Sequence, residues 1–320
     1  MSISESIPTS HDYRVIDPDY DIILIVTPKP TASSDPKPEP KATRFKASSK
    51  HLTLTSKYFK GRLNSPWPEG EELKQKGIVE LDIPDTDPEA FEVVLNLMHC
   101  RTKLVPREVE LPLLTQIAVV VDYFDCHEAL GLYPESWVNK LRDSVPGMFC
   151  ADAINWIFIA YVFGEADIFS CVTRLAQAQG LGTFDTRQLP IPKKIIDGIN
   201  SVRIDTLTKM FKILTDYQER LMGPKVICSF ECDSTKLGAI IKTMKSRGLL
   251  LRAENASFPG YSVRKILDCI LDFPRIEVCG KCSSYGFGSR EKYSIIDRST
   301  KAEIESAARS LNGLSIPNVL

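Results

Sequence analysis

Two short apolar segments near the start of the chain have the pattern of β-strands. Residues 20–26 form a β-branched run with prolines on either side, which is typical of a buried strand. Residues 77–83 alternate instead, with Val79, Leu81 and Ile83 on one face and acidic residues on the other. We expect both segments to belong to one small sheet.

Helical spacing of apolar residues follows each predicted strand. Residues 48–63 have this spacing, and Asp87-Pro88 is a typical helix start, because aspartate caps free amides and proline fits the first turn. Phe91, Leu95 and Met98 then share one helical face. Two more helices are predicted over residues 111–124 and 135–141.

Two segments lack any periodic pattern. Residues 1–18 are polar and contain prolines, so we expect a loose arm. Residues 27–43 hold five prolines, which excludes a helix or a sheet interior and predicts a surface loop.

The second half of the chain is mainly helical in pattern. Residues 153–163 are apolar almost all round, which indicates a core helix, and residues 203–221 have the clearest helical period. Residues 226–230 resemble a strand. The other predicted helices cover residues 168–176, a segment from about Asp233 to Gly248, residues 262–271 and residues 301–311.

These patterns predict an α+β domain followed by a mostly helical region. The expected domains are the arm 1–18, an α+β domain at 19–142, a helical domain at 143–223 and a small α+β unit at 224–320.

Composition and charge exclude some classes of function. Forty basic against forty-one acidic residues give a net charge of -1, so no global positive field attracts nucleic acid. We expect no membrane span and no secretory signal, and therefore an intracellular protein of the cytoplasm or nucleus. Nine cysteines, an odd number, then predict free thiols or metal ligands and no complete set of disulfides.

The sequence contains no standard catalytic signature. A phosphate-binding loop, a zinc-protease HExxH motif and a GxSxG nucleophile elbow are all missing. We therefore predict that the chain is not an enzyme. An enzyme with an unfamiliar active site is the alternative.

Four cysteines have the spacing of a zinc site. Cys228 and Cys232 precede Cys279 and Cys282 by about fifty residues, and paired short cysteine loops are the usual way to hold structural zinc. Four unlinked thiols are the alternative, since free cysteine is commonly buried. Nearby lysines add a second hypothesis, a zinc-stabilised regulatory or nucleic-acid-binding protein.

The order of elements up to residue 141 resembles the BTB/POZ family, especially its divergent fungal branch. Residues 21–26 are similar to the family's opening strand, Phe45-Lys46-Ala47 with Leu52, Ser56 and Phe59 to its next motif, and Asp87-Pro88 with Phe91 and Leu95 to its central helix. The resemblance implies a charged pocket that contains Asp21. However, Ser48 and Ser49 occupy the positions of the family's histidine and the basic residue after it.

The resemblance implies a protein–protein interaction module without cofactors. The expected partner is a protein, for example a cullin-type ubiquitin ligase scaffold. The contact surface would lie on the helices near residues 91–98 and 111–124, and the residues expected on it are Asp21, Phe91, Leu95 and Met98. A self-associating scaffold is an equal alternative, and the sequence leaves homodimerisation open.

Overall fold

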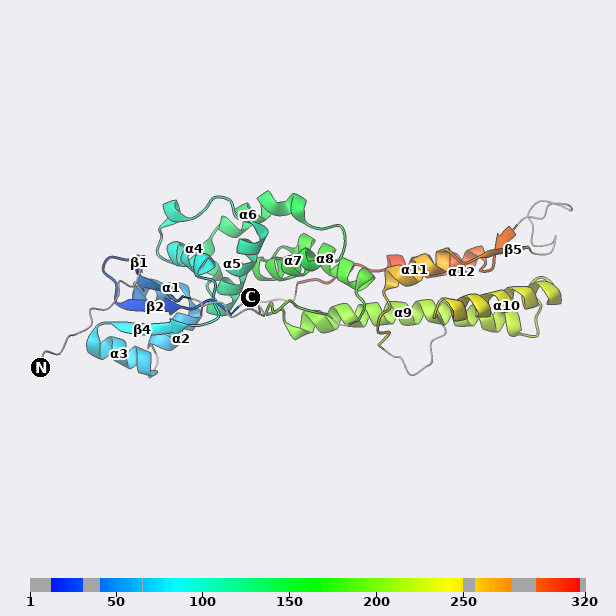
Figure 1. The fold of residues 1–320 in the computed structure, drawn as a ribbon, viewed down its shortest axis with the longest axis horizontal. Helices are drawn as coiled ribbons and strands as arrows, with labels where there is room; N and C mark the ends of the chain where they lie inside the picture. The colour runs from blue at the N-terminus through cyan, green and yellow to red at the C-terminus, as the bar shows by residue number, and fades with distance from the viewer. Residues whose placement is uncertain are drawn as a thin grey trace, which may run out of the picture. The chain divides into compact units, whose positions relative to one another are not determined.

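The computed structural model is a mixed α+β fold that is mostly helical, with a small sheet near the N-terminus (Figure 1). It describes residues 13–30, 41–64, 66–182, 184–249, 257–277 and 292–316. Its contacts divide the chain into unit 1, Met1–Val145 with Phe158–Glu165, and unit 2, Pro146–Ile157 with Ala166–Leu320. The predicted domains at 143–223 and 224–320 thus lie largely within one unit.

A four-stranded sheet forms one layer of unit 1, in the order β1-β3-β2-β4. The strands are β1 (Tyr13–Val15), β2 (Ile22–Val26), β3 (Thr43–Ala47) and β4 (Val79–Ile83). Strand β2 pairs antiparallel with β3 and parallel with β4, while β1 pairs parallel with β3. In β4 the alternate residues Val79, Leu81 and Ile83 are buried, as their spacing predicts.

The prediction of a loose arm is wrong at residues 13–18. Strand β1 belongs to the sheet edge, and the backbone N–H groups of Ile16 and Asp17 both donate to the carbonyl of Lys46. All three residues of β1 are exposed, so this strand has no apolar pattern that a sequence could reveal. Residues 1–12, and residues 31–40 of the predicted loop, lie outside the described residues.

Six α-helices complete most of unit 1. They are α1 (Ser49–Thr55), α2 (Lys57–Asn64), α3 (Pro68–Lys76), α4 (Pro88–Met98), α5 (Leu111–Phe124) and α6 (Tyr133–Leu141). Helix α4 starts as predicted, because the Asp87 carboxylate accepts a hydrogen bond from the Ala90 N–H at 2.9 Å. Helix α3 was not predicted: its residues are mostly polar, so it has no apolar stripe.

Unit 2 is built around the 30-residue helix α9 (Lys193–Met222). Helix α9 contacts α8 (Ala166–Gln179), α10 (Phe230–Ser246), α11 (Val263–Leu271) and α12 (Arg298–Arg309). The short strands β5 (Arg275–Glu277) and β6 (Lys292–Ser294) pair antiparallel. Helix α7 (Ala151–Phe163) contains the boundary between the two units. No helix of the described segments is long and apolar enough to cross a membrane.

The predicted strand at residues 226–230 is wrong. Phe230 is the first residue of α10, and the hydroxyl of Ser229 caps this helix by accepting from the Cys232 N–H at 3.2 Å. The Asp233 carboxylate accepts from the Ile227 N–H at 2.7 Å and so holds the preceding turn. These local side-chain bonds compete successfully with an extended backbone.

A buried cation fixes the packing of α9. Arg203 is 1% exposed, and its guanidinium donates to the carbonyls of Gly180, Ser257, Phe258 and Tyr261. Desolvation by burial lowers the pKa of Arg203. The four carbonyls come from the segments that follow α8 and precede α11, so one side chain holds both segments against α9.

We predict that Arg203→Met lowers the free energy of unfolding by about 3 kcal/mol, because four backbone carbonyls lose a charged donor that is itself buried. Chemical denaturation followed by circular dichroism measures this change. The control is Lys209→Met on the exposed face of the same helix, which should change stability by less than about 0.5 kcal/mol. Equal stability of the two variants would contradict the prediction.

Candidate interaction surface

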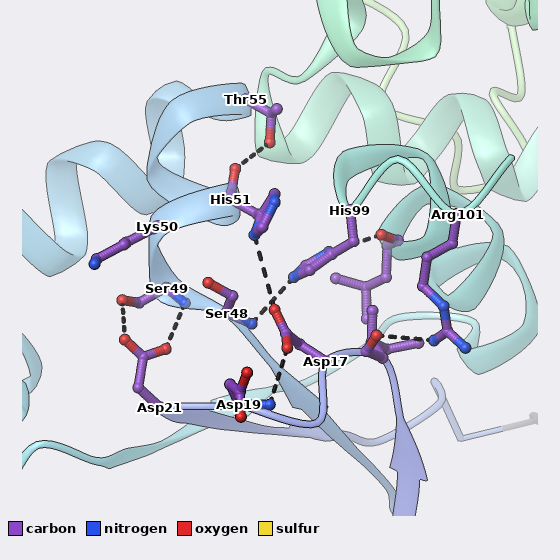
Figure 2. Close-up of polar contacts among 12 residues, drawn as sticks. Asp17, Asp19, Asp21, Ser48, Ser49, Lys50, His51, Thr55, His99 and Arg101 are labelled. Carbon is purple, nitrogen blue, oxygen red and sulfur yellow. Dashed lines mark hydrogen bonds and ion pairs between the residues drawn. The ribbon is translucent and has the colours of Figure 1, made fainter.

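Asp21 lies just before β2 and is bonded to the start of α1 (Figure 2). One carboxylate oxygen accepts from the Ser49 backbone N–H at 2.6 Å, and the other accepts from the Ser49 hydroxyl at 2.5 Å. The carboxylate therefore stabilises the N-terminus of α1, where partial positive charge accumulates. At the position where the resemblance implies a basic partner, Asp21 has a neutral serine.

His99 connects the same corner to α4. Its Nε2 accepts from the Ser48 N–H at 3.1 Å, and its Nδ1 bonds to the Leu95 carbonyl at 2.8 Å. Because a carbonyl can only accept, Nδ1 carries the proton and the imidazole is neutral. Burial, the largest cause, lowers the pKa of His99 and keeps it in this form.

The surrounding polar groups bond mostly to one another. The ring of His51 stacks on His99 with centroids 4.9 Å apart, and its Nδ1 lies 3.9 Å from a carboxylate oxygen of Asp17. Arg101 donates to the carbonyls of Val15 and Ile16. This corner holds the sheet edge against α1 and α4, and we assign it a structural role.

The predicted contact residues Phe91, Leu95 and Met98 are not on the surface. Their exposed fractions are 1%, 0% and 2%, and the Phe91 ring packs against Phe45 and Phe124. The prediction is wrong because an apolar helical stripe has the same pattern whether it faces the core or a partner.

The predicted zinc ligands are only partly described. Cys232 is buried in the first turn of α10, and Cys228 is half-buried in the turn before it. Cys279 and Cys282 lie outside the described residues. Among the residues that are described, no group of three or more His, Cys, Asp or Glu side chains could hold a metal ion.

A groove between α2 and the start of α3 was not identified from the sequence. We call it the α2–α3 groove, and its lining consists of Lys57, Lys60, Gly61, Asn64, Pro66 and Trp67. Trp67 is 58% exposed, whereas Trp137 and Trp156 are fully buried. In the sequence this place is marked by the pair Trp67-Pro68, but the pair does not reveal that the indole stays exposed in the fold.

Exposed aromatic and charged groups also lie where α2 meets α5. Tyr123 on α5 is 60% exposed, and its ring centroid lies 5.4 Å from that of Tyr58 on α2. Lys57 forms an ion pair with Asp125 at 3.1 Å, which joins the start of α2 to the end of α5. Lys57 therefore lines the groove and also pairs with the residue that follows α5, while Tyr123 of α5 contacts Tyr58 on the same helix α2.

Comparison with known proteins adds no family assignment. No protein-family model matches the sequence, and a search of curated proteins finds no significant match.

We predict that unit 1 loses stability as the pH falls from about 7 to about 5, because the pKa of His99 is lower in the folded chain than in the unfolded chain. The contribution of neutral His99 is complete above the unfolded pKa of about 6.5 and declines as the pH falls toward the folded pKa. His99→Gln should flatten this dependence in denaturation curves. His127→Gln, which changes an exposed imidazole, is the control and should retain the wild-type slope. Identical slopes for all three proteins would refute the prediction.

Proposed function

We propose that this chain is a non-enzymatic protein–protein interaction module with a BTB/POZ-like unit 1. The observation that carries the proposal is the exposure of two large aromatic side chains beside α2, Trp67 at 58% and Tyr123 at 60%. Tryptophan and tyrosine are enriched at the centres of protein interfaces, where an apolar ring is desolvated by a partner.

The arrangement of elements supports the resemblance on which this proposal draws. Strand β2 is followed by β3 and the helices α1 and α2, and β4 then returns parallel to β2 before the capped helix α4 and helix α5. This is the expected order of strand, helix, strand, capped helix and further helix, with β3 and α3 added.

A cullin-type ubiquitin ligase scaffold is the partner that the resemblance favours. Because α4 is buried along nearly its whole length, such a partner must contact other residues than Phe91, Leu95 and Met98. Helix α5 exposes Pro112, Gln116 and Tyr123, and it ends beside α2. We therefore place the contact surface on α5 and α2.

We predict that the full-length chain binds the purified N-terminal region of a cullin, and that Tyr123→Glu weakens binding about tenfold or more, measured by calorimetry. The control is Leu132→Glu, because Leu132 is 78% exposed in the same unit and lies at the start of α6. Light scattering of the chain alone tests the scaffold alternative, for which the mass should be about twice 35.8 kDa. A monomer that binds no cullin would contradict the proposal.

A zinc-stabilised regulatory protein is the second candidate, and one observation favours it. Asp233, beside Cys232, is 5% exposed, and one of its carboxylate oxygens is buried without a hydrogen-bond partner. Burying such an oxygen costs free energy, which a nearby cation would offset. Strand β5 ends at Glu277, two residues before Cys279 in the sequence.

If this candidate is right, mass spectrometry of the purified native chain should detect about one equivalent of zinc. Cys228→Ser and Cys279→Ser should each abolish zinc retention, whereas Cys171→Ser, a half-buried cysteine of α8, should retain it. Less than about a tenth of an equivalent in the wild type would remove this candidate.

A further inference from the structure

We propose that the α2–α3 groove binds an acidic peptide segment of a partner protein. In this complex Lys57 and Lys60 pair with carboxylates, and Trp67 packs against an apolar side chain of the same segment. The inference rests on the proposed function, since it specifies the chemistry of a partner, but it concerns a different surface from that of Tyr123.

The charge of the lining favours an anionic occupant. The six lining residues include two lysines and no carboxylate. Lys60 forms no ion pair with any of the described residues, and Lys57 pairs with Asp125 through side chains that are 83% and 45% exposed. An exposed pair of this kind contributes little free energy, so a bound carboxylate can compete for Lys57.

The shape of the lining favours an extended segment. Gly61 presents no side chain, and a Cβ atom built on it would meet nothing within 4 Å. The indole of Trp67 adds an apolar surface to the same lining as Gly61. The Asn64 side-chain amide can both donate a hydrogen bond to a peptide backbone and accept one from it.

Side-chain hydrogen bonds join the two helices that flank the groove. Arg62 on α2 donates to the Tyr58 hydroxyl at 3.1 Å and to the Glu69 carboxylate on α3 at 2.6 Å. The hydrogen bond from Arg62 lowers the pKa of Glu69, so this bridge is maintained at neutral pH. A groove that needs no reordering loses less conformational entropy on binding.

The surroundings favour a protein segment over a nucleic acid. Glu71 and Glu72 follow in the first turns of α3 and pair with Lys74 and Lys76 of the same helix. A continuous polyphosphate would pass these carboxylates, and two lysines provide too small a basic surface to compensate. A peptide can carry its carboxylates beside Lys57 and Lys60 and uncharged residues elsewhere, whereas a polyphosphate is charged at every unit.

Fluorescence can test the proposal on the full-length chain, because Trp67 is the exposed one of three tryptophans. The probe is a decapeptide with four glutamates around a pair of leucines, and the matched control has lysine at those four positions. We expect the acidic peptide alone to change the Trp67 emission, saturably, and 0.5 M salt to weaken its binding.

Substitutions should localise the binding site. Lys57→Glu and Lys60→Glu should each weaken binding at least about tenfold. Gly61→Leu should block the groove, while Gly238→Leu, also at a helical glycine with open space around its Cβ position, should not affect binding. Both leucine variants should remain folded, because leucine is a better helix former than glycine.

Three outcomes would overturn the inference: equal binding of both peptides, acidic-peptide binding that Gly61→Leu leaves unchanged, or tighter binding of a ten-nucleotide oligothymidine than of the acidic peptide. No binding of any probe would also overturn it. None of these results affects the cullin titration with Tyr123→Glu, so the failure of this inference and that of the proposed function can be told apart.

Discussion

The packing of Phe124, the last residue of α5, holds three helices of unit 1 together. Its ring stacks on Phe59 at 5.1 Å and contacts Phe91 at 5.3 Å, and its carbonyl accepts from the Ser56 hydroxyl at 2.5 Å. Helices α2, α4 and α5 are thus held together at one point. Because α2 is fixed there, its opposite face and Tyr123 remain available to other molecules.

The features that the sequence predicted are those with a local cause. The alternation in β4 and the Asp87 cap of α4 each depend on residues within a few positions of one another, and both were found as expected. The features that were missed depend on distant residues. Strand β1 forms because β3 provides a pairing partner about thirty residues away in the sequence. The first ten residues of α9 were not predicted as helix, because Arg203 interrupts the buried apolar stripe of Ile195, Ile199 and Leu207.

The candidate site shows the same division. The sequence correctly identified Phe91, Leu95 and Met98 as one face of a helix, but only the packing shows that this face is covered. Asp21 was expected in a charged pocket, but its carboxylate accepts hydrogen bonds from the backbone N–H and the hydroxyl of Ser49. The α2–α3 groove could not be predicted, because it depends on the placement of a polar helix against α2.

Arg203 also restricts how unit 2 can move. A shift of α9 along its axis by one helical turn, about 5.4 Å, would separate the guanidinium from all four carbonyl acceptors at once. All of these acceptors are backbone carbonyls, so no flexible carboxylate side chain could follow the guanidinium and keep a bond to it. Arg203 therefore opposes translation of α9 along its own axis relative to the segments that follow α8 and precede α11.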